Sequence, residues 1–243
     1  MENPANKLHT LLKEAYDDCR TIKTFDTSFK ETWSKVFKID PNDRSALLTS
    51  MNSMLNLFLT TQEYIKANEI LNNERNLNFL SNIEQALSSM NFDGDMSTFK
   101  SHINSETLTA LSFISDHMNF IYNLHESEIN SIEIANLIKD IDILIENITD
   151  STLAEDVKIL LLKNLNAIRF SLNSYKISGT EGMRVALEQS IGSLFINNEI
   201  IIPVAHDENV KNIFNIIDKI NILLSTGSSA KDLIGPLFGF LLK

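Results

Sequence analysis

The stretch VKILLLKNLNAIRFSL, residues 157–172, decides the fold that we expect. Its apolar residues are spaced so closely that a helix built from them carries apolar side chains on most of its sides. Such a helix is usually buried among other helices at the centre of a protein. We therefore predict a hub helix over 157–172, with amphipathic helices packed around it.

The chain on both sides of the hub helix repeats an apolar spacing of three and four residues, which is typical of amphipathic helices. Stripes with this spacing recur over 8–22, 47–65, 77–90, 111–124, 137–148 and 210–224. Glycine and proline number only 7 and 4, whereas sheet-rich folds need many of both in their turns. We predict the all-α class, as a multi-helix bundle of about eight to ten mostly antiparallel helices.

Several short patterns predict where helices begin or where the chain turns. Ser28 and Glu31 have the spacing of a capping box. Asp40 before Pro41 predicts a helix start, and NFDGDMS at 91–97 predicts a turn rather than a calcium loop, because its spacing does not fit an EF-hand. The run of isoleucines before Pro203 predicts a short strand or a linker that crosses the core.

The turn at 91–97 also suggests how the chain is divided. We predict an N-terminal helical part, 1–92, and a C-terminal helical part, 97–243, which contains the hub helix. A division near 125–130 is the alternative. Because no long Gly/Ser-rich linker separates the parts, both can share one continuous core.

The ionisable residues give no catalytic, cofactor-binding or metal-binding candidates. The net charge of −11 argues against a nucleic-acid partner, because phosphate contacts need clustered Lys and Arg. The single cysteine, Cys19, lies on an apolar stripe and is expected in the core. His117 and His125 are eight residues apart, and no histidine pair has the three- or four-residue spacing of helical metal ligands. No nucleotide-binding or hydrolase motif occurs.

The expected location is the cytoplasm. The N-terminus, MENPANKLHT, lacks the basic and apolar regions of a secretory signal. No apolar run approaches the roughly 18 residues of a membrane-spanning helix. The frequent Asn, Ile, Ser and Lys suggest AT-rich coding and a bacterial or phage source.

One segment, 137–195, resembles a segment that recurs in uncharacterised bacterial helical proteins. In those proteins a helix ends in Tyr-x-Ile/Val, Gly-x-x-Gly follows, and the next helix contains Ala-Leu-Glu. The matching positions here are Tyr175, Ile177, Gly179, Gly182 and residues 186–188. The resemblance implies a helix, a tight turn and a second helix packed back on the first. It implies no activity, and it is compatible with an accessory or defence locus.

The segment DLIGPLFGFLLK, 232–243, is the best sequence candidate for an interaction site. Read as a helix, it is expected to contact a partner through Leu233, Leu237, Phe238, Phe240 and Leu241. Three interpretations stay open for it: core or subunit interface, a face that docks on a partner, and a membrane-inserting segment.

These observations together predict a non-enzymatic, soluble interaction or regulatory protein. Its expected partner is another protein or a second copy of the chain, as in a homo-oligomer. One alternative is a membrane-acting effector that uses the C-terminal apolar helices. The other is a cryptic helical nuclease, or another enzyme, whose site assembles from distant helices.

Overall fold

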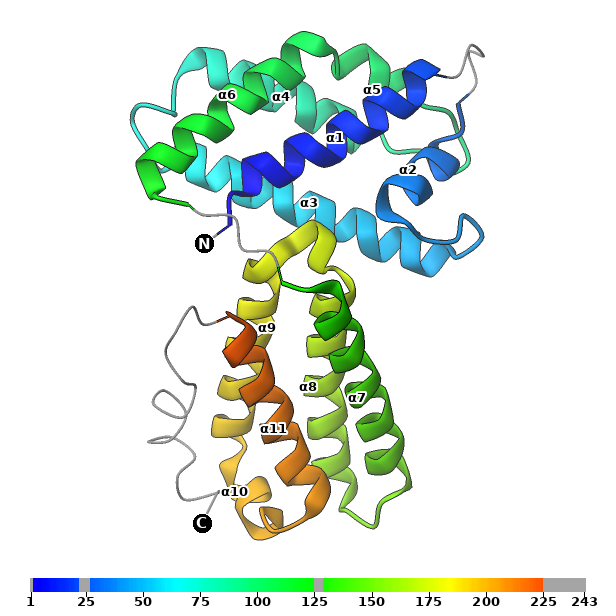
Figure 1. Cartoon of the computed structure of the whole chain (residues 1–243), viewed down its shortest axis with the longest axis vertical. Coiled ribbons are helices and arrows are strands. Elements are labelled where there is room, and N and C mark those ends of the chain that lie inside the picture. The colour runs from blue at the N-terminus through cyan, green and yellow to red at the C-terminus, as the bar shows by residue number, and fades with distance from the viewer. Residues whose placement is uncertain (1, 22–26, 125–128, 225–243) are drawn as a thin grey trace. The chain divides into compact units, whose positions relative to one another are not determined.

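The computed structural model describes residues 2–21, 27–124 and 129–224, and the structural statements below refer to these residues. Every regular element in them is a helix, apart from an isolated bridge between Ser28 and Asp95 (Figure 1). The predicted all-α class is therefore confirmed. The described residues form eleven α-helices and one 3-10 helix. The shortest of them are too short to show an apolar stripe in the sequence.

The chain divides into two compact units. The first comprises Met1–Glu126 and Lys176–Ser178, and the second comprises Ser127–Tyr175 and Gly179–Lys243. The division lies near 125–130 rather than at 92–97. Residues 92–97 belong to the first unit, because the ring of Phe92 lies 5.6 Å from that of Phe29 and the carbonyl oxygen of Gly94 accepts a hydrogen bond from Phe29 N. These contacts join residues far apart in sequence, so the local pattern that suggested a boundary does not show them.

The first unit consists of six helices of unequal length. They are α1 (Pro4–Thr21), α2 (Phe29–Phe37), α3 (Arg44–Lys66), α4 (Glu74–Ser88), α5 (Ser97–His102) and α6 (Ser105–Tyr122). Helix α1 packs on both α3 and α6. The core holds an aromatic cluster in which Trp33 stacks on Phe37 at 5.4 Å and meets Phe99 edge-on at 5.6 Å. Cys19 is buried in this core, as expected.

Two predicted helix starts in the first unit have different outcomes. Ser28 caps α2 by accepting a hydrogen bond from Glu31 N, so that prediction is confirmed. The start expected at Asp40–Pro41 is wrong. Helix α3 begins later because Asp43 Oδ1 accepts from Ala46 N at 2.9 Å, while the side chain of Asp40 closes a turn. Both aspartates suit a cap, and the backbone amide within reach decides which one acts.

The second unit is built on four long helices. Its elements are α7 (Ser131–Asp150), α8 (Glu155–Asn173), α9 (Tyr175–Ile196), α10 (Asn198–Ile201), a 3-10 helix (Ile202–Val204) and α11 (Glu208–Leu224). Figure 1 shows α7, α8, α9 and α11 running up and down beside one another. Leucine, isoleucine and valine fill nearly all of the core between them. The isoleucine run before Pro203 is helical, so neither a strand nor an extended linker forms there.

The predicted hub helix corresponds to α8, although α8 is not buried on all sides. Leu161, Leu165 and Ile168 have no exposed surface, whereas Ile159 and Phe170 face outward. Helix α8 is thus one of four helices around a shared core. Its outward apolar residues made the sequence look like that of a fully surrounded helix.

A glycine bends the chain near the start of α9. Gly179 has φ 62° and ψ −157°, a combination that essentially only glycine adopts. The sequence predicted a tight turn at Gly179 and Gly182. The structure instead places one sharp kink at Gly179 and continues the helix through Gly182.

Candidate functional site

The five sequence candidates for an interaction site lie outside the described residues. They are Leu233, Leu237, Phe238, Phe240 and Leu241. Hollows lined by side chains from neighbouring helices open on both units, and those between α4 and α6 differ in their chemistry from the one between α7 and α11.

The first groove runs between α4 and α6 on the first unit. It consists of two adjoining hollows of about 470 and 330 Å³ that share Arg75, Phe79, Ala110 and Phe113. Ile70, at the turn before α4, lies at one end with His117. We call this surface the α4–α6 groove. Its length along two packed helices suits an elongated ligand better than a compact one.

The α4–α6 groove is bordered by large apolar side chains that face solvent. Phe113 is 61% exposed and Ile70 is 70% exposed, and Phe120, seven residues along α6 from Phe113, is 89% exposed. Residues seven apart lie on the same side of a helix, so the two phenylalanines project together. Helix α6 uses its opposite side for the core, through Leu111 and Met118. Contiguous exposed apolar surface commonly marks an interaction site.

Hydrogen bonds fix the walls of the α4–α6 groove. Asn73 caps α4 by accepting from Asn76 N at 3.0 Å, and Asn76 Nδ2 donates to the carbonyl oxygen of Leu71 at 2.9 Å. On α6, His117 Nδ1 donates to the carbonyl oxygen of Phe113 at 2.9 Å. These bonds hold backbone and side chains in place, so the groove is formed before a ligand arrives.

The charge of the α4–α6 groove is available to a ligand. Among the described residues, no carboxylate lies within ion-pair distance of Arg75, which lines both hollows. An arginine beside an apolar groove can receive an acidic side chain in two parallel hydrogen bonds. Apolar anchors, the Arg75 guanidinium and the carboxylate of Glu106, which lines the smaller hollow, therefore define the recognition chemistry of this surface.

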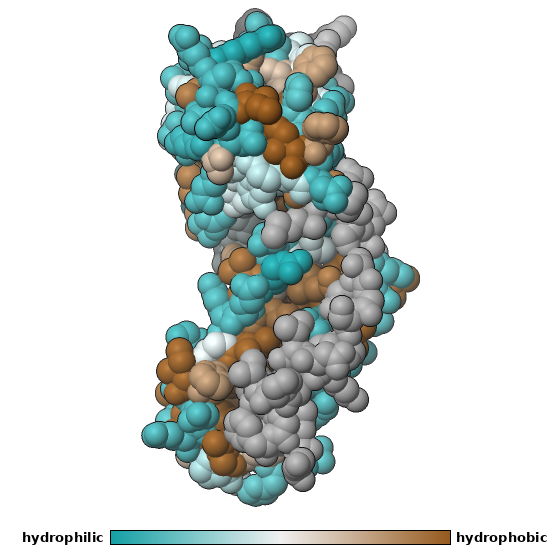
Figure 2. All heavy atoms as spheres, turned by 90° about the vertical axis from the view of Figure 1, so that its left-hand side faces the viewer, coloured by the Kyte–Doolittle hydropathy of each residue, from teal (hydrophilic) through white to brown (hydrophobic). Residues whose placement is uncertain are grey.

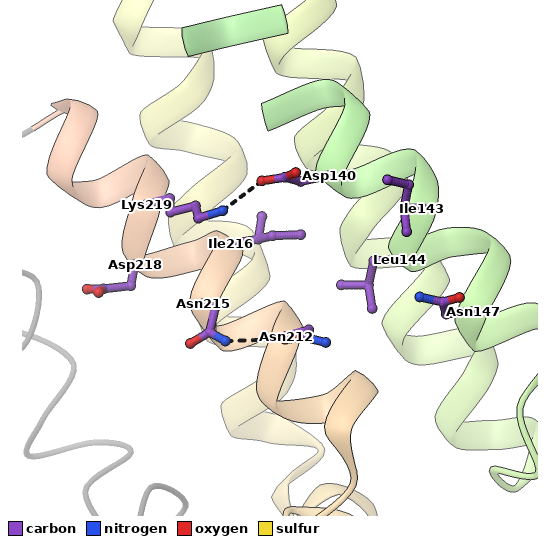
Figure 3. A pocket seen from close by; sticks show the side chains of 9 residues that line it. All are labelled: Asp140, Ile143, Leu144, Asn147, Asn212, Asn215, Ile216, Asp218 and Lys219. Carbon is purple, nitrogen blue, oxygen red and sulfur yellow. Dashed lines mark hydrogen bonds and ion pairs between the residues drawn. The ribbon is translucent and has the colours of Figure 1, made fainter. Parts of the chain in front are cut away.

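The second groove lies between α7 and α11 and is more polar (Figure 3). It has a volume of about 440 Å³ and is lined largely by Asn and Asp side chains around Ile143, Leu144 and Ile216. Lys219 Nζ and Asp140 Oδ2 lie 2.6 Å apart, and Asn215 Nδ2 donates to Asn212 Oδ1 at 3.3 Å. Because its polar groups are partly paired with one another, this groove offers a ligand less than the α4–α6 groove does.

Three described ionisable residues of the first unit have shifted pKa values, namely His9, Cys19 and Asp95. Hydrogen bonds from the side chain and backbone of Ser97 lower the pKa of the Asp95 carboxyl. Burial lowers the pKa of His9, nearby Lys13 lowers it further, and Asp116 on α6 acts in the opposite direction. Burial raises the pKa of the Cys19 thiol. A lowered pKa keeps the His9 imidazole neutral to more acidic pH, and a raised pKa keeps Cys19 in its thiol form.

Two properties of the described residues bear on the metal-site and membrane alternatives that the sequence raised. Within 2–21, 27–124 and 129–224, no group of three or more His, Cys, Asp or Glu side chains is placed to hold a metal ion. None of the helices there has the length and apolar content of a membrane span. His125, one of the histidines considered from sequence, lies outside these residues.

Comparison of the chain with protein-family models, with curated proteins and with solved structures found no match. The resemblance of 137–195 to bacterial helical proteins therefore stays a prediction.

The sequence of α6 contains a sign of the α4–α6 groove that lies outside the core stripe. The core stripe at 111–124 accounts for Leu111 and Met118 but leaves out Phe113 and Phe120. Two phenylalanines seven residues apart and off the core stripe predict an apolar outer face. The contribution of Ile70 and Phe79 depends on how α4 packs on α6, so the spacing within one helix does not reveal it.

Proposed function

We propose that this chain is a non-enzymatic interaction protein whose α4–α6 groove binds an apolar segment of a partner protein. The observation that carries the proposal is the exposure of Phe113 at the centre of a preformed groove. A cytoplasmic location, a regulatory role and a bacterial accessory or defence locus belong to the proposal as well. These rest on the sequence alone.

The partner segment that fits best is an amphipathic helix. A helix in a groove between two others presents residues at positions i, i+3, i+4 and i+7, and Phe113, Phe79 and Ile70 supply apolar surface for them. Fully burying one large apolar side chain contributes about 1.5–3 kcal/mol. An acidic residue on the partner helix would pair with Arg75. The expected ligand is therefore an apolar helix that carries at least one Asp or Glu.

Site-specific photocrosslinking in the natural host cell tests this proposal. A photoreactive amino acid replaces Phe113 in one version of the chain and Leu48 in a control version. Leu48 is exposed on α3 and lines neither groove. We expect one discrete protein adduct from position 113 that position 48 does not give. Equal adducts from both positions, or none from either, would contradict the proposal.

The trapped protein is then purified and its affinity is measured directly. Phe113→Ala should weaken binding by about thirtyfold, because a central aromatic contact often contributes 2 kcal/mol or more. Leu48→Ala should leave the affinity unchanged. Arg75→Gln should weaken binding less than Phe113→Ala does, and only when the partner segment keeps its acidic residue.

The same surface can serve self-association, and sedimentation equilibrium distinguishes this case. If the partner is a second copy, the average mass rises with concentration and Phe113→Ala keeps the chain monomeric. A wild-type chain that stays monomeric over the whole concentration range rules out the homo-oligomer and leaves a different protein as the partner.

A further inference from the structure

Two opposite charges line the smaller hollow of the α4–α6 groove without pairing with each other. They are Arg75 on α4 and Glu106 on α6. Within 2–21, 27–124 and 129–224, no opposite charge lies within ion-pair distance of either side chain. A ligand in this hollow therefore meets a free cation and a free anion.

The two charges occupy different places along the α4–α6 groove. Glu106 lines only the smaller hollow, whereas Arg75 also lines the larger one, which ends at Ile70 and His117. Along α6, Glu106 precedes His117 by eleven residues, a rise of about 16 Å. The groove thus has a negative charge toward one end, a positive charge next to it and an apolar stretch beyond. This order distinguishes the two directions in which a helix could lie in the groove.

The position of Arg75 is unfavourable for α4 itself. Arg75 is the second residue of α4, and the helix dipole opposes a cation near a helix N-terminus. The dipole instead favours Glu106, which lies in the first turn of α6. Glu106 therefore also stabilises its own helix, whereas the charge of Arg75 is better explained by a contact outside α4.

The other flank of α6 offers a ligand fewer free charges. A hollow of about 340 Å³ between α1 and α6 shares Ser105, Thr109 and Phe113 with the smaller hollow of the groove. Its acidic and basic side chains, Lys13 and Asp17, pair with each other at 2.9 Å. The free charges beside Phe113 therefore lie on the α4 flank.

Apolar and hydrophilic side chains adjoin on the surface of the first unit, as Figure 2 shows for one of its sides. An apolar centre bordered by polar groups is the usual arrangement of a protein–protein interface. In the α4–α6 groove, Phe113 supplies the apolar centre and is 61% exposed. Apolar contacts of this kind are non-directional, so they hold a helix in either direction. Charges beside them can select one direction.

We propose that the partner segment of the α4–α6 groove carries a Lys or Arg that pairs with Glu106 and an Asp or Glu that pairs with Arg75. The two pairs fix the direction of the bound segment, because the reversed segment brings like charges together. This inference rests on the proposed function, since it concerns the ligand of the same groove.

A library of displayed peptides tests the charge order on the full chain. Each peptide is a helix-forming segment with leucine at positions i, i+3, i+4 and i+7, and its other positions vary among Glu, Lys and Gln. The immobilised protein is the wild-type chain, and peptides that also bind Phe113→Ala are removed. We expect the enriched peptides to carry Lys toward one end of the leucine stripe and Glu nearer its middle, always in the same order.

An inverted groove shows which residues select that order. The double variant Arg75→Glu with Glu106→Arg exchanges the two charges and should select the opposite order. A peptide selected on the wild-type chain should bind Glu106→Arg about tenfold more weakly. Replacing the Lys of that peptide by Glu should restore its affinity for Glu106→Arg.

Glu155→Arg is the matched control for Glu106→Arg. Glu155 lies in the first turn of α8, as Glu106 does in α6, so both substitutions place a cation against a helix dipole. Glu155 lines none of the hollows described above, and its substitution should leave the affinity of the peptide unchanged.

The other outcomes separate this inference from the proposed function. Enrichment without a charge order, or an order that the inverted groove does not change, would overturn the inference and leave the groove as an apolar binding site. Enrichment of acidic residues alone would exclude Glu106 from the contact and overturn the inference as well. If no peptide binds the wild-type chain better than Phe113→Ala, both the inference and the proposed function are wrong.

Discussion

The two units of this chain fill their cores with different side chains. Most of the buried aromatic and sulfur-containing residues lie in the first unit, as Phe29, Trp33, Phe37, Phe58, Phe99, Cys19, Met51, Met54, Met96 and Met118. The buried core of the second unit is Leu, Ile and Val, apart from Phe214 and Met183. Helices as short as α2 and α5 leave irregular spaces, which rings and flexible methionines fill. Four long helices form regular layers that branched aliphatic residues fill.

The largest expected effect comes from the aromatic cluster. Trp33→Ala should lower the free energy of unfolding of the first unit by about 3–5 kcal/mol, because it leaves a large cavity beside Phe37 and Phe99. Urea unfolding followed by circular dichroism measures the loss, and hydrogen exchange locates it. Trp33→Phe should cost less. If hydrogen-exchange protection falls as much in α7 and α8 as in α2 and α3, the two units do not draw their stability separately from their two cores.

The matching change in the aliphatic core is Leu161→Ala at the middle of α8. Leu161 has no exposed surface, and the substitution should cost about 2–5 kcal/mol in the second unit. The fluorescence of Trp33 reports on the first unit alone, so its urea midpoint should stay unchanged while the dichroism midpoint falls. Leu161→Met, which conserves volume, should cost less than about 1.5 kcal/mol. A parallel shift of both probes would show that the units unfold together.

A buried asparagine in each unit sharpens the comparison. Asn3 Oδ1 accepts backbone amides at the start of α1, and its Nδ2 donates to Ser115 O and Asn119 Oδ1 on α6, both at 2.8 Å. Asn164 Nδ2 donates within its own helix and to Ser193 Oγ at 3.2 Å. Asn3→Ala should cost about 2 kcal/mol through the lost cap and the unpaired acceptors on α6.

Asn164→Ala is the control for the buried amide, and it should cost less than Asn3→Ala, because no helix cap is lost. Asn3→Ser should recover part of the loss, since its hydroxyl oxygen can still cap α1. Chemical denaturation of the three variants at one pH ranks them. If Asn164→Ala instead lowers the free energy of unfolding more than Asn3→Ala does, the hydrogen bond from Asn164 to Ser193 contributes more to the second unit than expected for an aliphatic core.

The smallest effect is a pH dependence confined to the first unit. The folded chain lowers the pKa of His9, so below about 6.5, the ordinary histidine value, the unfolded chain binds the proton first. The free energy of unfolding should therefore fall as the pH is lowered from 7 toward 5. His9→Gln should make this slope shallower for the Trp33 fluorescence transition. An unchanged slope would show that other groups set the acid response.

Much of the fold could be predicted from the spacing of the apolar residues. The buried side of a helix is marked by apolar residues only three or four positions apart, so a short stretch of sequence shows it. The stripe at 210–224 is an example, since Val210, Ile213 and Ile217 are fully buried. The division of the chain could not be predicted in the same way. Whether 92–97 separates two units or belongs to one depends on its contact with Phe29, more than 60 residues away in sequence.

The same distinction between local spacing and long-range packing applies to the candidate site. Phe113 and Phe120 show their outward direction in the sequence, because both fall off the core stripe of α6. Arg75 and Ile70 join them only through the packing of α4 on α6, which no spacing encodes. The C-terminal candidates lie outside the described residues.

The kink at Gly179 also has an evolutionary consequence. Its backbone conformation forbids a side chain for reasons internal to the peptide, so descendants of this chain should keep glycine at 179 in every setting. Gly192, by contrast, has helical backbone angles, and a Cβ atom there would meet no atom within 4 Å. Among natural variants, position 192 should therefore accept other residues while position 179 stays glycine.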